Sequence, residues 1–95
     1  MKRYKAVPNL DATTFPALVA RELARARTVH PRPFASAHEA ASIVREEHDE
    51  FWDEVKLKDR NTLAMLKELT HLAAMCQRTA EDVLGIGREN ERGAQ

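Results

Sequence analysis

Hydrophobic residues recur every three or four positions along most of the chain, and no stretch shows the two-residue alternation typical of a strand. A first helix is expected to begin near Thr14, whose side chain can cap it, with Pro16 in its first turn. The helix should end before His30-Pro31-Arg32-Pro33, because two closely spaced prolines are incompatible with helix and favour an extended connector. Phe34 is expected to pin this connector to the core.

Two further helices follow the connector. Ser36-Ala37-His38-Glu39 has the Ser-x-x-Glu form of a capping box, which predicts a second helix from here to about Lys56. After a polar turn, the third helix opens at Asn61 or Thr62 and reaches Leu84, where two glycines supply the stop. Because the turn is short, the second and third helices should form an antiparallel hairpin.

Each predicted helix carries an apolar face that should contribute to the core. On a helical wheel these faces comprise Phe15, Leu18, Val19, Leu23 and Ala26 in the first helix; Ala40, Ile43, Val44, Phe51 and Val55 in the second; and Leu66, Leu69, Leu72, Ala73, Cys76, Ala80, Val83 and Leu84 in the third. Cys76 is interpreted as a small core residue. Trp52 lies opposite the apolar face of its helix and is expected to contact another subunit.

The predicted fold class is therefore all-α, with a helical hairpin plus an N-terminal helix. Residues 1–13 form an N-terminal extension, residues 14–84 a single helical domain, and residues 85–95 a polar tail that is expected to be disordered. A chain of 95 residues buries only about 60–65% of its unfolded surface, which leaves a thin core. We therefore expect a homo-oligomer, a dimer or a tetramer.

Charge and hydropathy exclude several partners. Fifteen basic residues balance fifteen acidic ones, so no overall field attracts a nucleic acid polymer or an anionic membrane. No apolar run approaches the roughly 20 residues that span a bilayer. The basic start Met1-Lys2-Arg3-Tyr4-Lys5 is not followed by the apolar segment of a signal peptide. We expect a cytoplasmic protein.

The second helix carries a cluster of carboxylates on its apolar side. With Ile43 at zero on the wheel, Glu47 falls at about 40°, Glu54 at about 20° and Glu50 at about 340°, whereas Glu46 swings away to the sector at about 240–300°. Ionised carboxylates in apolar surroundings cost several kcal/mol unless a cation compensates them. The hairpin places Glu68 of the third helix opposite this cluster, and such oxygen ligands suit magnesium or manganese.

The spacing of these carboxylates resembles the signature of a known family. Glu46-Glu47-x-x-Glu50, seventeen intervening residues and Glu68-x-x-His71 are similar to the Glu-Glu-x-x-Glu … Glu-x-x-Asp signature of the all-α nucleoside triphosphate pyrophosphohydrolases, the MazG-like proteins. The similarity extends from Val29 to Leu84 and is to blocks seen in short phage and bacterial members. It includes the blocks His30-Pro31-Arg32-Pro33-Phe34, Ser36-Ala37-His38-Glu39-Ala40, Asp49-Glu50-Phe51-Trp52-Asp53-Glu54-Val55 and Ala73-Ala74-Met75.

The resemblance implies a four-helix-bundle oligomer that binds Mg²⁺ and cleaves nucleoside or deoxynucleoside triphosphates between the α and β phosphates. The products would be a monophosphate and pyrophosphate, with base and sugar preference left open. Carried over by position, Glu47, Glu50 and Glu68 match family metal ligands. His71 stands where the family has Asp, and the wheel turns it away from the apolar face. The site is then impaired, favours Mn²⁺, or recruits Glu54 or Asp82.

Further side chains are assigned to the reaction that this resemblance implies. In the hypothesis, Glu46 or Glu54 accepts a proton from the attacking water, and Lys56, Lys58 or Arg60 contacts the outer phosphates. An alternative of a different class remains open. The chain could be a catalytically impaired helical bundle that acts as a nucleotide-binding or protein-binding module, and His71 is the observation that favours it.

Overall fold

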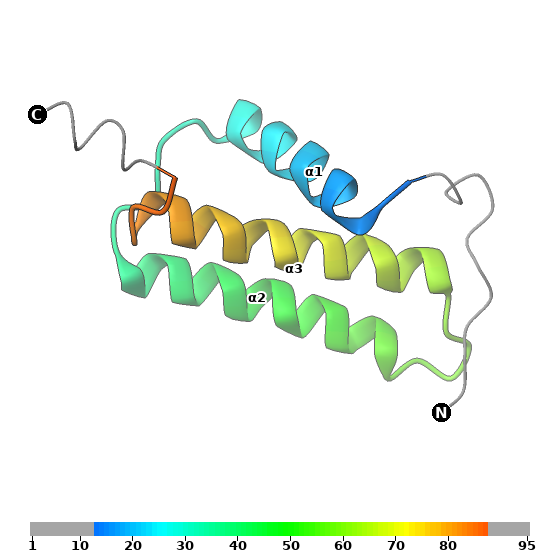
Figure 1. Ribbon diagram of the computed structural model, residues 1–95. Coiled ribbons are helices and arrows are strands. Elements are labelled where there is room, and N and C mark those ends of the chain that lie inside the picture. The colour runs from blue at the N-terminus through cyan, green and yellow to red at the C-terminus, as the bar shows by residue number, and fades with distance from the viewer. Residues whose placement is uncertain (1–12, 88–95) are drawn as a thin grey trace, which may run out of the picture.

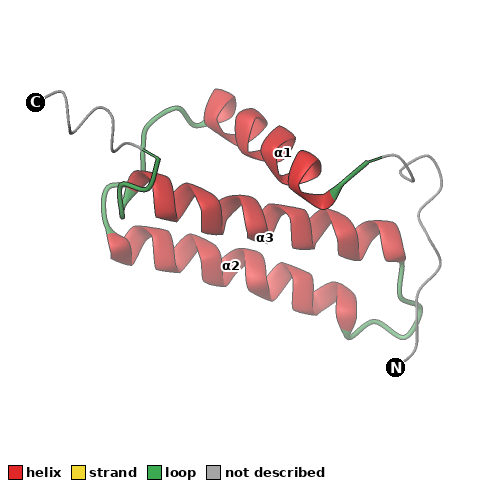
Figure 2. Cartoon of the chain, in the orientation of Figure 1, coloured by secondary structure: helices red, strands yellow, loops and turns green. Residues whose placement is uncertain are grey.

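The structure, a computed structural model, describes residues 13–87, and this part of the chain is all-α. Three helices follow one another: α1 (Phe15–Val29), α2 (Ala37–Val55) and α3 (Thr62–Asp82). Figure 2 shows only helices and loops in the described residues. The predicted tail begins at Gly85, and most of it, like most of the N-terminal extension, lies outside the described residues.

α3 is the central helix of the fold. It lies between the other two helices, packing against α2 as an antiparallel hairpin and against α1, which crosses it obliquely in the same chain direction (Figure 1). α1 and α2 do not pack against each other. The predicted hairpin is confirmed, and α3 additionally forms the floor between its two neighbours.

The predicted helix starts are confirmed by their capping hydrogen bonds. The Thr14 hydroxyl accepts from the amide of Ala17 at 3.3 Å, and the Ser36 hydroxyl accepts from the amide of Glu39 at 3.1 Å. The side-chain oxygen Oδ1 of Asn61 accepts from the amide of Ala64 at 3.0 Å. These bonds satisfy backbone donors that have no partner within the first helical turn. α3 ends two residues before the predicted Leu84, and Gly85, with a φ of 74°, follows it.

The core of the described residues is thin, as the length of the chain predicts. Its buried apolar residues are Val19, Leu23, Ala26, Ala40, Ala74 and Met75, and no large side chain is fully buried. The faces predicted for α1 and α2 contribute in part: Val19, Leu23, Ala26 and Ala40 are buried, Ile43 and Val44 pack against the core, and Phe15 at the start of α1 is 38% exposed. Leu18, Phe51 and Val55 are half-buried. The expected role of Phe34 is also confirmed, since its side chain packs against this core.

The core face predicted for α3 is wrong. The buried residues of this helix are Thr70, Ala74, Met75 and Arg78, on the side opposite the most apolar arc. Leu69 is 37% exposed, and Cys76, predicted to be buried, is exposed. The physical reason is that a central helix must contact two neighbours, so its packing surface follows the positions of α1 and α2 rather than its own apolar maximum.

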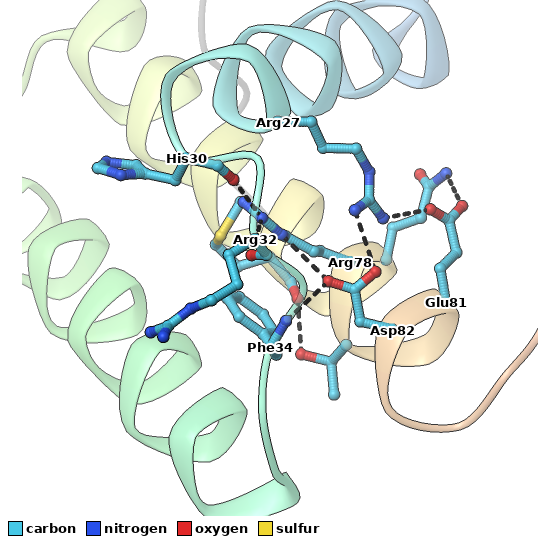
Figure 3. Close-up of polar contacts among 10 residues, drawn as sticks. Arg27, His30, Arg32, Phe34, Arg78, Glu81 and Asp82 are labelled. Carbon is cyan, nitrogen blue, oxygen red and sulfur yellow. Dashed lines mark hydrogen bonds and ion pairs between the residues drawn. The ribbon is translucent and has the colours of Figure 1, made fainter.

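A buried carboxylate connects α1, the proline-containing connector and the end of α3. The side chain of Asp82 is fully buried, and it accepts from Arg27 Nη1 at 3.0 Å, Arg78 Nε at 3.3 Å and the backbone amide of Phe34 at 3.1 Å (Figure 3). Burial alone would raise the pKa of Asp82, but the Phe34 amide and the two guanidinium groups outweigh it and hold the pKa below its usual value.

Arg78 completes this connection from inside the fold. Its side chain is only 3% exposed, and its Nη2 atom donates to the carbonyl oxygens of His30 at 2.6 Å and Arg32 at 3.0 Å (Figure 3). Its guanidinium also stacks 4.9 Å from the centre of the Phe34 ring. The two prolines therefore leave the connector extended, and Arg78 and Asp82 hold its backbone onto α3.

No helix in residues 13–87 is both long and apolar enough to cross a membrane. This agrees with the hydropathy of the sequence.

Replacing Asp82 with Ala should destabilise the protein by about 3 kcal/mol, because it leaves the buried Arg78 charge without its carboxylate. Glu81→Ala is the matched control. Glu81 pairs with Arg27 at 2.7 Å, but its side chain is 33% exposed, so its loss should cost less than about 1 kcal/mol. Urea unfolding of both variants measures the difference, and equal losses would contradict the role given to Asp82.

Candidate metal centre

Three side chains from two helices converge beside the centre of α3. Glu47 extends from α2 toward α3, and Glu68 and His71, one turn apart on α3, face it. One ligand atom from each residue lies within 4.8 Å of the other two. The structure thus brings together the predicted Glu47 and Glu68, and it also places His71, which the wheel turned away, within the cluster.

The two carboxylates lack the partners that buried oxygens normally have. Oε2 of Glu47 and Oε2 of Glu68 are each buried and accept no hydrogen bond from the described residues. Nδ1 of His71 lies 3.9 Å from each of these two oxygens. The three side chains are 19–23% exposed, so the cluster is sheltered but open to solvent on one side.

Burial and neighbouring carboxylates disfavour the ionised form of Glu47. Desolvation by burial, followed by the negative charge of Glu50 and of Glu68, raises the pKa of Glu47 from 4.5 to about 7. Part of this carboxylate is therefore protonated at neutral pH. A bound cation would place a positive charge beside Glu47 and so stabilise its ionised form.

Glu22 of α1 lies next to the cluster, on the far side of the His71 ring, and sequence reasoning missed it. Its Oε1 atom lies 3.6 Å from Nε2 of His71, and both its oxygens accept from Arg25, at 2.8 and 2.6 Å. The hydrogen bond to Arg25 lowers the pKa of Glu22 against the opposing effect of burial, with a smaller contribution from His71. Its signal in the sequence is that it is the single acidic residue of α1 and lies within the apolar face, between Leu18 and Ala26 on the helical wheel.

A cleft of about 560 Å³ opens over the cluster, a volume in the range of small-molecule sites. α1, the connector, α2 and α3 all contribute to its lining. Glu47 and His71 of the cluster line it, the other charged side chains of the lining are Glu22, Arg25, Arg32, Glu39 and Arg78, and Phe34, Ile43 and Met75 add apolar surface. Acidic ligand atoms, basic groups and an aromatic ring thus share one concave site.

The other carboxylates predicted for the site lie around this cluster rather than in it. Glu50 is exposed one turn beyond Glu47, near enough for its charge to raise the pKa of that residue. Glu46 is exposed on the outer side of α2. Glu54 lies two turns from Glu47, about 10 Å along the helix axis. Asp82 is committed to Arg27 and Arg78 and is not free to replace a ligand.

The basic residues predicted to contact phosphates lie at the far end of α2. Lys56 follows the last residue of α2 and pairs with Asp53 at 3.0 Å, Lys58 is exposed in the turn, and Arg60 Nε donates to the carbonyl of Val55 at 2.6 Å. None of the three lines the cleft, where Arg25 and Arg32 are the partly or fully exposed basic residues. Sequence reasoning missed both of these arginines.

The donor set fits a divalent cation. Two carboxylate oxygens without partners and one imidazole nitrogen are close enough for small side-chain rotations to bring them to the ligand distances of about 2.0–2.2 Å found for Mn²⁺-sized or Zn²⁺-sized ions. The carboxylates suit Mg²⁺ and Mn²⁺, whereas the imidazole favours Mn²⁺ and later transition metals over Mg²⁺.

In the metal-free protein, stability should fall as the pH rises from about 5 to about 8. The folded state keeps a proton on Glu47 up to a pKa of about 7, whereas the unfolded chain releases it near 4.5, so ionisation favours the unfolded state in this window. The expected loss is about 1–2 kcal/mol after allowance for solvent screening. Urea unfolding in the presence of a chelator measures it.

Glu47→Gln should flatten this pH dependence, while Asp49→Asn, which removes an exposed carboxylate of the same helix, should preserve it. Below pH 4 the trend should reverse, because Asp82 and Glu81 have lowered pKa values and lose their ion pairs on protonation. A wild-type protein that gains stability between pH 5 and pH 8 would contradict the assignment of a strained carboxylate.

No protein-family model matches the chain, and no curated protein and no solved structure matches it either. The chemistry assigned to the cluster therefore rests on its own residues.

Proposed function

We propose that the protein is a metal-dependent nucleoside triphosphate pyrophosphohydrolase, with the cation held by Glu47, Glu68 and His71. The observation that carries this proposal is the pair of buried carboxylate oxygens without partners, placed beside an imidazole nitrogen. Glu47 and His71 of this cluster also line the cleft. The resemblance of the Glu-Glu-x-x-Glu … Glu-x-x-His spacing to the MazG-like signature supports the choice of substrate. The imidazole ligand favours Mn²⁺ over the Mg²⁺ expected from that resemblance.

The cleft offers contacts for the rest of a nucleotide. Arg32, an exposed residue of the cleft lining, is assigned to the outer phosphates in preference to the distant Lys56, Lys58 and Arg60, while Arg25 remains paired with Glu22. The Phe34 ring, already stacked on Arg78, gives an apolar wall. The volume of about 560 Å³ accommodates a mononucleotide better than a polymer.

The proposed reaction adds one water molecule across the phosphoanhydride bond. A bound cation would neutralise phosphate charge and acidify water. The water oxygen bonds to a phosphorus atom, the bond to the bridging oxygen breaks, and pyrophosphate departs from the monophosphate. Glu50 accepts the proton in this scheme, because it is exposed to water one turn from Glu47, whereas Glu46 faces outward and Glu54 is two turns away.

The alternative function is a non-catalytic bundle. It was supported by His71, which replaces the aspartate of the family signature and was predicted to point away from the apolar face. In the structure, however, Nδ1 of His71 lies 3.9 Å from both Glu47 and Glu68. A side chain in this position can replace the aspartate of the family signature as a ligand. The enzyme is therefore the better supported of the two functions.

Pyrophosphate release from a panel of ribonucleoside and deoxyribonucleoside triphosphates, with Mn²⁺ or Mg²⁺, tests the proposal. Wild-type protein should release pyrophosphate, faster with Mn²⁺ than with Mg²⁺. Glu47→Gln and Glu68→Gln should each reduce kcat/KM by at least about 100-fold. Loss of a residue that only orients a metal ligand costs about 10-fold to 100-fold, and loss of the ligand itself should cost more. Glu50→Gln should lower kcat while leaving the metal affinity nearly unchanged.

Asp49→Asn is the matched control and should retain full activity, since Asp49 is an exposed carboxylate that pairs with His48 at 3.7 Å, away from the cluster. His71→Asp should shift the preference toward Mg²⁺. Folded wild-type protein that releases no pyrophosphate across the whole panel would overturn the enzyme and leave the binding module as the function.

We further propose that a second copy of this chain covers the exposed apolar arc of α3. Leu69 and Cys76 are exposed on this arc, Trp52 on α2 is 53% exposed, and no large side chain of the described residues is fully buried. A thin core of this kind is commonly completed by oligomerisation. A second copy is the partner of choice because an identical helical arc offers a self-complementary apolar surface.

Sedimentation of the wild-type chain should give at least twice the monomer mass of 10.8 kDa. Leu69→Glu should yield a folded monomer, because it places a charge in the proposed interface. Ser42→Glu, which adds the same charge at an exposed position of α2, should leave the oligomer intact. A monomeric wild-type protein at micromolar concentration would contradict this interface.

A further inference from the structure

Glu22 occupies a distinct place behind the candidate metal centre. The two ring nitrogens of His71 face different groups: Nδ1 lies 3.9 Å from Glu47 and from Glu68, and Nε2 lies 3.6 Å from Oε1 of Glu22. Glu22 is outside the set of three ligand atoms that converge. It therefore contacts the centre through the imidazole ring rather than directly.

Arg25 fixes the position of the Glu22 carboxylate. Its Nε donates to Oε1 at 2.8 Å and its Nη2 to Oε2 at 2.6 Å, so the two planar groups pair through two parallel hydrogen bonds. The side chain of Glu22 is 13% exposed, whereas that of Arg25 is 59% exposed. A surface arginine thus holds a sheltered carboxylate one turn away and leaves its Oε1 atom directed at His71.

We propose that Glu22 is a positioning residue that keeps the proton of neutral His71 on Nε2 and so leaves the Nδ1 lone pair free to bind the cation. This inference rests on the proposed metal centre and extends it to the helix that the sequence signature does not include. At 3.6 Å the Nε2 to Oε1 contact is longer than a hydrogen bond, and a shift of about 0.5 Å in either side chain would form one. A carboxylate that accepts from the second nitrogen of a metal-bound histidine fixes both its tautomer and its orientation.

The contact between Glu22 and His71 should make the metal centre prefer Mn²⁺ to Mg²⁺. Without Glu22, the nearest acceptors for the imidazole proton are Glu47 and Glu68, and both lie on the Nδ1 side. A proton there would block the nitrogen ligand and leave only the two carboxylates. Because Mg²⁺ depends little on an imidazole ligand whereas Mn²⁺ accepts one readily, Glu22 should favour Mn²⁺ selectively.

The tautomer of His71 can be observed in the full chain without any metal. Long-range ¹H–¹⁵N correlation spectra of metal-free protein at a single alkaline pH, where the imidazole is neutral, distinguish a proton on Nε2 from one on Nδ1. Wild-type protein should carry it on Nε2. Glu22→Ala should move population to Nδ1, and Glu22→Gln, which keeps an acceptor oxygen, should retain the wild-type form to a greater extent.

Calorimetric titration with Mn²⁺ and with Mg²⁺ measures the consequence for binding. Glu22→Ala should weaken Mn²⁺ binding by about 10-fold to 100-fold and Mg²⁺ binding by no more than about 3-fold, the share expected from the lost surface charge. Asp49→Asn should change neither affinity. Circular dichroism checks that each variant keeps its helices.

The outcomes separate this inference from the function on which it rests. Wild-type protein that binds Mn²⁺ with an Nε2 proton, yet releases no pyrophosphate, would support Glu22 as a positioning residue and overturn the enzyme. An unchanged tautomer and an unchanged Mn²⁺ to Mg²⁺ affinity ratio in Glu22→Ala would overturn the role of Glu22 alone. Equal losses for both cations would also overturn it, because they would make Glu22 a ligand or a packing residue. Wild-type protein that binds no Mn²⁺ would overturn both proposals.

Discussion

The buried Asp82 carboxylate is the interaction on which the arrangement of the three helices depends. It receives Arg27 from α1, the backbone of Phe34 from the connector and Arg78 from its own helix. These bonds hold the end of α1 over the end of α3 and direct the connector across to α2 (Figure 3). Since α1 and α2 do not pack on each other, this charged centre, together with the apolar contacts of Val19, Leu23 and Ala26 with α3, holds α1 in the position that brings Glu22 beside His71.

The cluster in that cleft has the opposite character. At Asp82 positive charge and hydrogen bonds stabilise a buried anion, whereas at Glu47 burial and neighbouring carboxylates raise the pKa to about 7. A fold of this size has little stability to spare. Holding carboxylate oxygens without partners is therefore most easily understood if the functional state includes a cation, which would convert mutual repulsion into attraction.

Much of this fold could be predicted from the sequence, because its signals are local. Thr14, Ser36 and Asn61 fix the helix starts through hydrogen bonds within a few residues, and the prolines of the connector exclude helix by their covalent structure. Glu47 could be identified because an ionised carboxylate within an apolar face is costly unless a cation compensates its charge. Glu22 lies within the apolar face of α1 in the same way, but its partner His71 is 49 positions further along the chain, beyond the reach of any local pattern. The core face of α3 was mispredicted for a related reason, since Leu69 and Cys76 follow the apolar arc whereas packing follows two neighbouring helices.

The central claim is that Glu47, Glu68 and His71 form a cation site, and diffraction from crystals grown with Mn²⁺ tests it most directly. Data collected above and below the manganese absorption edge locate the ion without reference to activity. The account predicts an anomalous peak among these three side chains, within about 2.5 Å of His71 Nδ1 and of one oxygen from each carboxylate. A map with no peak there, or with manganese bound only elsewhere on the molecule, would contradict it.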